Sequence, residues 1–258
     1  MLSRRFSALL WTLVSVTVVV TPLVISRSAA DVFRTPKDVV FQTLALLIFG
    51  VGVAGCLFSD AILATFRTHR TALMVAAAAV LWTAVATLTS LKPIVSFFKP
   101  LTVFCLAAFF VASMWAVWNR GSSAITAALA PAVVNAVVAF LQSIEVWSPI
   151  ELGAVTDPRL RTTAFLGNPN DVGSFFVLPA IAAVAAALAW RNLKWLYVLA
   201  VIAVAGVVAA QSITSMIALA CGLGTAIFTP AAKRFRRAGM AVLAVLVVAL
   251  LLHPGSRG

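Results

Sequence analysis

The sequence is poor in charged residues, and poorer still in acidic ones. Charged residues make up 10% of the 258 positions. The chain has 7 Asp and Glu residues and 19 Lys and Arg residues, which gives a formal net charge of +12. Hydrophobic residues account for 63% of the chain, and the mean hydropathy is +1.10. Because a soluble domain of this length cannot bury so much apolar surface, the composition excludes a soluble globular protein. It predicts an all-α, polytopic transmembrane helix bundle.

Residue types that hold metals and cofactors are also scarce. The chain has 2 His and 3 Cys residues, and it contains no Walker loop, Rossmann glycine pattern, HExxH motif or CxxC pair. Cys56, Cys105 and Cys221 fall inside apolar runs without disulfide or metal spacing, so we expect them to pack as small apolar residues. We expect His69 in a solvated loop and His253 at a membrane boundary, and nothing marks the nucleophile of a hydrolase. The sequence therefore predicts no metal and no cofactor.

Apolar runs of membrane-spanning length recur along the chain, which we expect to form a single transmembrane domain over residues 1–258. We predict about nine spans, at residues 6–25, 39–58, 71–90, 101–118, 122–143, 172–190, 194–211, 214–230 and 238–252. Basic residues are more frequent in the segments that lie inside when the N-terminus is cytoplasmic, which predicts that orientation. The basic clusters fit topology and anionic lipid better than nucleic acid. The expected location is the inner (cytoplasmic) membrane, with the lipid bilayer as partner.

The N-terminus resembles a targeting signal in part. Arg4 and Arg5 precede the first apolar run, and the sequence at 28–30, Ser-Ala-Ala, resembles a signal-peptidase site. The run at 6–25 is longer than the core of a usual signal peptide, and further spans follow it. We therefore favour a first transmembrane helix over a cleaved signal.

Few polar residues lie inside the predicted spans. Asn135 and Gln142 are seven positions apart, so they share one face of the fifth span. Because polar groups are costly in lipid, such a pair either lines a cavity or forms hydrogen bonds between helices. Hydrogen bonding is the favoured interpretation.

The most informative stretch ends the predicted extracytoplasmic loop at 144–171. Asn168 is a good N-cap, Pro169 suits the first helical position, and Asp171 stands where a capping-box acid reaches back. A helix that begins here directs its free N–H groups and positive dipole end toward the membrane surface. With Arg159 and Arg161 nearby, that geometry suits an anion such as a phosphate. The residue types alone also fit a helix start that is merely well capped.

A second predicted outside cluster lies between the first two spans, at residues 31–38. Its cations Arg34 and Lys37 fit two roles equally well, as snorkelling membrane anchors or as ligands for an anion. Together with Arg159 and Arg161, they would give the outer surface a pocket for a diphosphate headgroup.

Three segments carry a resemblance to a known family. The sequence RTTAFLGNPND at 161–171 resembles the "R…G…GNPN" element of the O-antigen ligase and O-antigen polymerase family. The sequence DVFRTPK at 31–37 is similar to that family's segment between its first two helices. The sequence QSITS at 211–215, which precedes a small-residue helix containing Gly222, resembles the family's next element. All three agree in order and spacing, and the resemblance spans most of the chain.

The resemblance implies a membrane enzyme that takes a glycan from a polyprenyl diphosphate carrier on the outer face of the cytoplasmic membrane. The acceptor in that family is lipid A core or a growing polysaccharide, and no nucleotide sugar or metal is required. A diphosphate leaving group needs positive charge near its oxygens as the glycosidic bond breaks. The candidate substrate-binding residues are Arg161, Arg159, Lys37, Arg34, Asn168 and Asn170, and the catalytic residues are unknown.

The chain departs from the family pattern in two ways. Ile213 stands where many members have arginine after the serine, so one expected cation is missing. Members of the family also continue into a large outside loop with catalytic basic residues and then into further helices. The resemblance therefore implies an N-terminal portion that is C-terminally incomplete relative to the family. A multi-span transporter, for example of the inorganic-carbon type with the same fold, and an inactive fragment are the alternatives.

Overall fold

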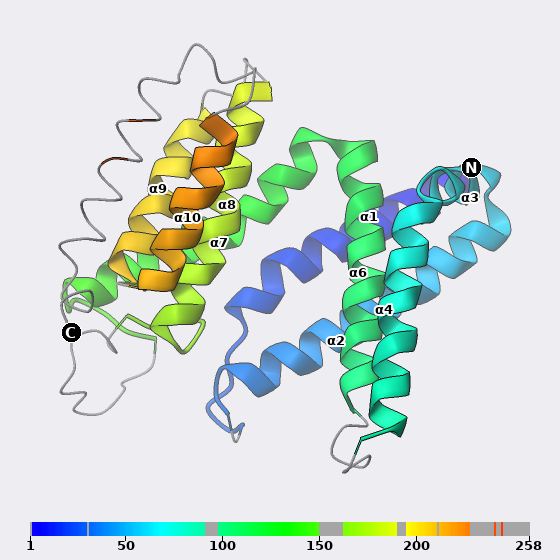
Figure 1. Cartoon of the computed structure of the whole chain (residues 1–258), viewed down its shortest axis with the longest axis horizontal. Coiled ribbons are helices and arrows are strands. Elements are labelled where there is room, and N and C mark those ends of the chain that lie inside the picture. Colours follow the sequence, from blue (N-terminus) through cyan, green and yellow to red (C-terminus); the bar gives the residue numbers. More distant parts are fainter. Residues whose placement is uncertain are drawn as a thin grey trace. The chain divides into compact units, whose positions relative to one another are not determined.

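Helices make up all the secondary structure that the computed structural model assigns within the described residues (Figure 1). The structure describes residues 2–29, 31–90, 98–149, 162–189, 195–210 and 212–227, together with Met240 and Ala244. The elements are α1 (Leu2–Val20), η1 (Thr21–Leu23), α2 (Arg34–Phe58), α3 (Asp60–Thr68), α4 (Arg70–Leu88), α6 (Phe98–Arg120), α7 (Ser122–Ser143), α8 (Pro169–Ala189), α9 (Trp195–Ala209) and α10 (Ile213–Ile227). This confirms the predicted all-α class for the part of the chain that the structure describes.

Six of these helices are long and apolar enough to cross a membrane. These spans are Arg4–Leu23, Arg34–Phe58, Arg70–Leu88, Phe98–Arg120, Ser123–Ser143 and Asn170–Ala187. The predicted seventh and eighth spans correspond to α9 and α10, which have 15 residues each and are shorter than a usual span. The predicted ninth span lies outside the described residues, apart from Met240 and Ala244. The count of nine and the cytoplasmic N-terminus therefore stay predictions.

The chain divides into two compact units. The first consists of Met1–Val24 and Thr35–Ala124, and the second of Ile25–Arg34 and Ile125–Gly258. The short segment at 25–34 thus belongs to the second unit, although both helices that flank it lie almost entirely in the first.

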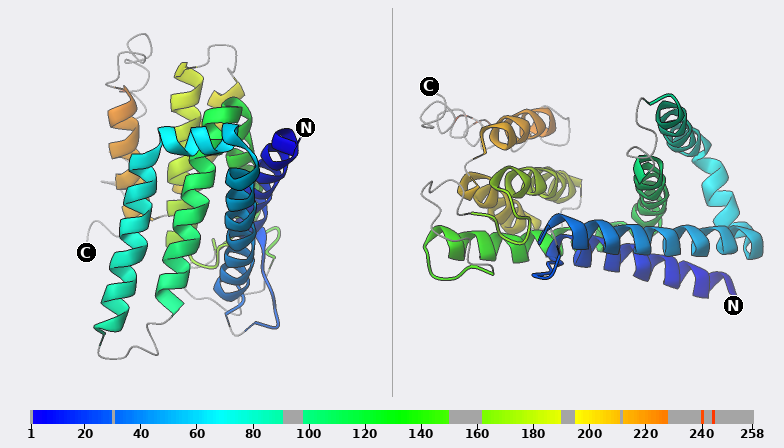
Figure 2. Two further views of the ribbon diagram at one scale, coloured as in Figure 1. Left: turned by 90° about the vertical axis from the view of Figure 1, so that its right-hand side faces the viewer. Right: turned by 90° about the horizontal axis from the view of Figure 1, so that it is seen from below.

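Two pairs of helices build the first unit. Figures 1 and 2 show α1 and α2 running side by side and crossing the pair formed by α4 and α6. The buried core where the pairs meet contains Leu10, Ile48 and Trp115. Edge-on ring contacts add to it, since Phe49 lies 4.8 Å from Phe104 between ring centroids.

The segment after α2 corrects one sequence expectation. We expected a solvated loop around His69, between the predicted spans 39–58 and 71–90, whereas the structure has the nine-residue helix α3 directly before His69. Ile62 of α3 is buried, and its Cδ1 atom lies 3.0 Å from where a Cβ at Gly55 would stand. The hydropathy windows missed this helix because a nine-residue amphipathic turn has no long apolar run.

Small residues allow close packing in the second unit, where α8 contacts both α9 and α10. A Cβ at Gly206 would stand 2.6 Å from the ring of Phe176, which is fully buried. In the same way, Gly222 of α10 makes room for Ile181 of α8. The core around these contacts is rich in alanine, as expected where helices approach closely in a membrane.

The prolines and cysteines of the spans occupy different environments. Pro131 and Pro179 lie inside α7 and α8, whereas Pro22 falls in the short turn η1 that follows α1. Cys105 is fully buried and packs as predicted, but Cys221 is exposed on α10.

The packing at Gly206 gives a direct test. We expect Gly206→Ala to destabilise the protein by about 1–3 kcal/mol, because the added methyl group collides with the buried ring of Phe176. Gly224→Ala in α10 is the matched control, because nothing lies within 4 Å of its added Cβ. The control should be neutral or stabilise the helix by up to about 1 kcal/mol. Thermal unfolding in detergent measures both, and equal melting temperatures would contradict the packing account.

Candidate functional site at the start of α8

The N-terminus of α8 has the cap that the sequence predicted. The side-chain Oδ1 of Asn168 accepts the backbone N–H of Asn170 at 2.9 Å, and the carbonyl of Asn168 accepts the N–H of Val172 at 3.0 Å. Pro169 is the first helical residue, where its missing N–H costs nothing. Asp171 lies in the first turn and is exposed, which suits the positive end of the helix dipole.

A tight turn leads into this cap. The carbonyl of Thr163 accepts the N–H groups of Leu166 and Gly167 at 2.9 and 3.0 Å. The turn requires two positive φ angles, +44° at Ala164 and +87° at Gly167. Glycine is favoured at the second position for two reasons, since φ is positive and a Cβ there would stand 2.5 Å from the ring of Phe33.

Gln142 of α7 holds the buried side of this turn. Its Oε1 accepts the backbone N–H groups of Thr163 and Ala164 at 3.0 and 2.6 Å. Its Nε2 donates to the hydroxyl groups of Thr163 and Ser148 at 3.2 and 2.9 Å. Gln142 is 5% exposed and Thr163 is 2% exposed, so these bonds form away from water, where an unpaired N–H group is most costly.

Asn135 extends the same arrangement by two turns of α7. Its Oδ1 accepts the N–H of Phe165 at 3.2 Å, and its Nδ2 donates to the carbonyl of Pro131 at 3.0 Å. The carbonyl that accepts the second bond is that of Pro131 itself, the proline inside α7. The sequence correctly placed Asn135 and Gln142 on one face and favoured hydrogen bonding between helices, whereas the bonds in the structure join α7 to a turn. It did not indicate that their partner is the backbone that precedes the Gly-Asn-Pro-Asn motif.

The segment at 25–34 lies against the turn from another side. Phe33 contacts Gly167, and Oδ1 of Asp31 accepts the N–H groups of Phe33 and Arg34 at 3.0 and 2.8 Å. Arg27 donates from Nη2 to the carbonyl of Pro149 at 3.4 Å, which joins the segment to the residues after α7. Two of the three segments that carry the family resemblance are therefore in direct contact.

The third segment lies beside the start of α8. Gly173 of α8 approaches Ser212 and Ser215 so closely that a Cβ would stand 2.6 Å from the Ser215 hydroxyl oxygen. Ser212 caps α10, since its Oγ accepts the N–H of Ser215 at 3.4 Å and its carbonyl accepts the N–H of Met216 at 3.0 Å. Because Ile181 of α8 also meets Gly222 farther along α10, the two helices are parallel and begin at the same end of the unit.

Three hydroxyl groups join α8 to α10 at this end. The Ser215 hydroxyl donates to the Ser212 oxygen at 2.9 Å, and the hydroxyl oxygens of Ser174 and Ser215 are 3.3 Å apart. Ser212 and Ser215 are buried, while Ser174 is exposed. Sequence reasoning did not single out Ser174. Ser174 could have been found from its position four residues after Asn170, because that spacing places the two residues on the same face of α8.

The predicted site residues have different outcomes. Asn168 and Asn170 form the cap of α8, and Arg34 is exposed in the second unit, next to Phe33. Lys37 belongs to the first unit, where its Nζ donates to the carbonyl of Val24 at 3.0 Å. The structure therefore gives Lys37 a role in joining the start of α2 to the end of α1.

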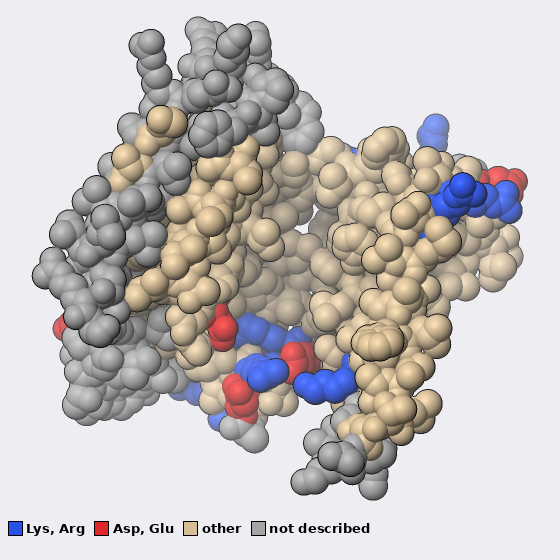
Figure 3. Space-filling model, viewed as in Figure 1, with Lys and Arg blue, Asp and Glu red and all other residues tan. Residues whose placement is uncertain are grey.

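The strongest predicted cations, Arg159 and Arg161, lie outside the described residues, as does Gln211. Among the residues that the structure does describe, no group of three or more His, Cys, Asp or Glu side chains could hold a metal ion. Figure 3 shows that the visible sides of α4, α8 and α10 carry uncharged atoms over most of their length.

Six membrane-spanning helices and a capped, hydrogen-bonded turn at one end of α8 define a multi-pass α-helical membrane protein. No protein-family model, curated protein or solved structure matches this chain.

The role of Gln142 is testable by substitution. We expect Gln142→Leu to destabilise the protein by at least about 1–3 kcal/mol, because the N–H groups of Thr163 and Ala164 stay buried without an acceptor. Ser143→Ala is the matched control, because the Ser143 hydroxyl is exposed and, among the described residues, bonds only the carbonyl of Phe140 in its own helix. The control should change the stability by less than about 0.5 kcal/mol. Thermal unfolding in detergent compares the two, and equal losses would contradict the account.

A double-mutant cycle tests the contact between Phe33 and Gly167. Gly167→Ala should destabilise the protein because of both the positive φ and the collision with the ring. In a Phe33→Ala background the collision is gone, so the same substitution should cost less, with a coupling energy of about 0.5–3 kcal/mol. Equal costs in the two backgrounds would show that the ring does not restrict this position.

Proposed function

We propose that the protein is a glycan-transferring membrane enzyme of the O-antigen ligase and polymerase type. It would bind a polyprenyl diphosphate-linked glycan at the outer face of the cytoplasmic membrane and transfer the glycan to lipid A core or a growing polysaccharide. The observation that carries the proposal is the pair of capped N-termini of α8 and α10, which begin side by side next to the Phe33–Arg34 turn.

The chemistry of this end suits a diphosphate. Each helix N-terminus carries roughly half a positive elementary charge, so two adjacent parallel termini attract the same anion. Arg34 adds a full charge at the neighbouring turn, and Arg161 and Arg159 directly precede the described part of the turn in the chain. The carboxylate of Asp171 in the first turn of α8 opposes an anion, so the helix termini alone do not suffice and the arginines are needed.

The proposed reaction defines what these groups do. A hydroxyl group of the acceptor attacks the anomeric carbon, the bond from that carbon to the diphosphate oxygen breaks, and negative charge grows on the diphosphate. Arginine guanidinium groups and helix N-termini stabilise that charge most strongly in the transition state. A base that takes the proton of the acceptor hydroxyl is not assigned to any residue.

The two alternatives differ in what supports them. A transporter needs polar groups along a passage. In the sequence, Asn135 and Gln142 were the main candidates for such groups. Both side chains are buried and bonded to the backbone at 163–165, so they support a structural role. An inactive fragment would keep the same fold without binding a diphosphate, and the experiments below separate it from the enzyme.

The first experiment is complementation by charge reversal. In cells that lack the protein, surface polysaccharide length and attachment are measured after return of the wild type, Arg161→Glu or Arg34→Glu. We expect Arg161→Glu to lower transfer by at least about 100-fold, as loss of a transition-state charge contact does, and Arg34→Glu to lower it less. Lys99→Glu is the matched control, because Lys99 is an exposed cation in the first unit, and it should keep activity.

Two results would count against the enzyme. Unchanged surface polysaccharide in the deletion strain would remove the proposed activity altogether. Equal loss in Arg161→Glu and Lys99→Glu would show a general effect of charge on membrane insertion. Stabilisation of the purified protein by undecaprenyl diphosphate, but not by undecaprenol, would separate a binding-competent protein from an inert one.

A further inference from the structure

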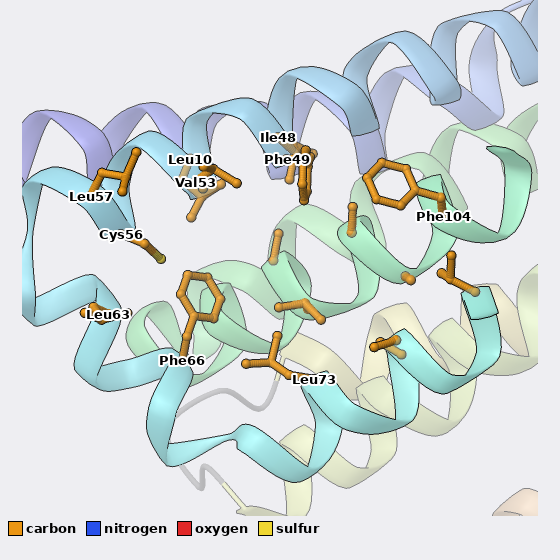
Figure 4. A pocket seen from close by; sticks show the side chains of 18 of the residues that line it. Leu10, Ile48, Phe49, Val53, Cys56, Leu57, Leu63, Phe66, Leu73 and Phe104 are labelled. Carbon is orange, nitrogen blue, oxygen red and sulfur yellow. The ribbon is translucent and has the colours of Figure 1, made fainter. Parts of the chain in front are cut away.

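The first unit contains a large apolar groove. Its volume is about 800 Å³, and side chains of α1, α2, α3, α4 and α6 line it (Figure 4). Every residue that lines it is apolar, and the aromatic side chains of Phe49, Phe66 and Phe104 point into it. A concave apolar site of this volume falls in the range of ligand-binding pockets, and here it lies within the membrane-spanning part of the chain.

The groove reaches about as deep as one leaflet of a bilayer. Along α4 its lining runs from Leu73 to Ala84, which is about 17 Å at the helical rise of about 1.5 Å per residue. The hydrocarbon core of a bilayer is about 30 Å thick, so the groove matches roughly half of it. That length suits the acyl chains of one lipid molecule rather than a passage across the membrane.

Five arginines gather at the end of the unit where α3 lies. Arg70 begins α4 and Arg120 ends the antiparallel helix α6, and the contact of His69 with Trp118, at 5.1 Å between ring centroids, joins these two helix ends. Arg4 and Arg5 begin α1, and Phe6 stacks on Phe58 at the end of α2, at 6.2 Å between ring centroids. Arg67 lies in the last turn of α3.

The charge at this end is strongly one-sided. The five guanidinium-bearing residues are all exposed, and Asp60 is the acid of the adjoining helix α3. Figure 3 shows charged atoms gathered around α3 and the N-terminus, while the visible sides of α4 stay uncharged. A net positive cluster at the mouth of an apolar groove matches an amphiphile with a negative head and a hydrocarbon tail.

Helix α3 links the two features. Leu63 and Phe66 line the groove, and Arg67, the next residue of the same helix, is exposed. A short helix that carries both apolar and basic side chains lies in the membrane interface. There it contacts both the acyl chains and the charged headgroup of a lipid. The general excess of basic residues on one membrane face explains the arginines alone, but it does not explain why they adjoin a leaflet-deep groove.

We propose that this groove binds an anionic phospholipid of the bilayer, with its acyl chains between α2, α4 and α6 and its phosphate against the arginines at α3. The proposal is independent of the proposed glycan transfer, because it rests on the first unit alone. It also concerns the opposite end of α1 and α2 from the segment at 25–34.

Substitution of two glycines in α2 tests the groove. Gly52 lines the groove and Gly50 does not, and nothing lies within 4 Å of a Cβ built at either position. Full-length protein in detergent is titrated with phosphatidylglycerol or phosphatidylcholine, and bound lipid is counted by native mass spectrometry. We expect the wild type to retain phosphatidylglycerol, Gly52→Phe to lose it, and Gly50→Phe to bind as the wild type does. If Gly52→Phe unfolds, Ala108→Leu fills the groove from α6 instead.

Neutralisation of the arginines tests the headgroup. The double variant Arg67→Gln and Arg70→Gln should weaken phosphatidylglycerol binding by roughly 25-fold, since each basic residue contributes about fivefold at an anionic surface. Lys99→Gln, at the opposite end of α6, is the control and should bind normally. Equal retention of phosphatidylglycerol and phosphatidylcholine by the wild type would overturn the anionic site. Equal losses in Gly50→Phe and Gly52→Phe would overturn the groove.

Discussion

The backbone N–H groups of Thr163, Ala164 and Phe165 are turned toward α7, and side-chain amides of α7 accept all three. This constraint decides much else in the second unit. Lipid offers no hydrogen-bond partner, so an irregular segment persists beside membrane helices only where protein groups satisfy its backbone. With the turn held in place, Asn168 caps α8, Gly167 meets Phe33, and α8 is set to begin beside α10. The amide of Gln142 uses both its acceptor and its donor in this arrangement, which an ionised carboxylate, having no donor, does not reproduce.

The two units solve the packing of apolar helices differently. In the second unit, glycine at Gly173, Gly206 and Gly222 brings α8 against its neighbours, and alanine fills the core. In the first unit, bulky residues such as Trp115 fill the crossing of two helix pairs, and the space beside that crossing stays open as a groove. Close packing in the second unit fixes the starts of α8 and α10 beside each other. The open packing of the first leaves apolar surface for molecules from the bilayer.

Local patterns in the sequence were sufficient for some of these features. Hydropathy located the long helices, and the order of Asn168, Pro169 and Asp171 correctly predicted the start of α8, because caps depend on neighbouring residues. The partner of Gln142 was not predictable, since a side chain's hydrogen bonds depend on what the fold brings to it from far along the chain. Helix α3 was missed because nine residues with one apolar face resemble a loop in a hydropathy window. The contact of Lys37 with the carbonyl of Val24 was likewise not predictable, and the role of Lys37 as a ligand stays a prediction.

The crossing of the helix pairs in the first unit constrains how this unit sits in a bilayer. Because α1 and α2 cross α4 and α6, both pairs cannot stand along the membrane normal at once. The longest of the four helices is α2, which has 25 residues and extends about 38 Å, whereas α4 has 19 residues and extends about 28 Å, at about 1.5 Å per residue. The longer helix therefore fits a tilted path and the shorter one an upright path through the same hydrocarbon thickness. In a thinner or thicker membrane, a change in the tilt of α2 would absorb the mismatch while α4 and α6 keep their pairing.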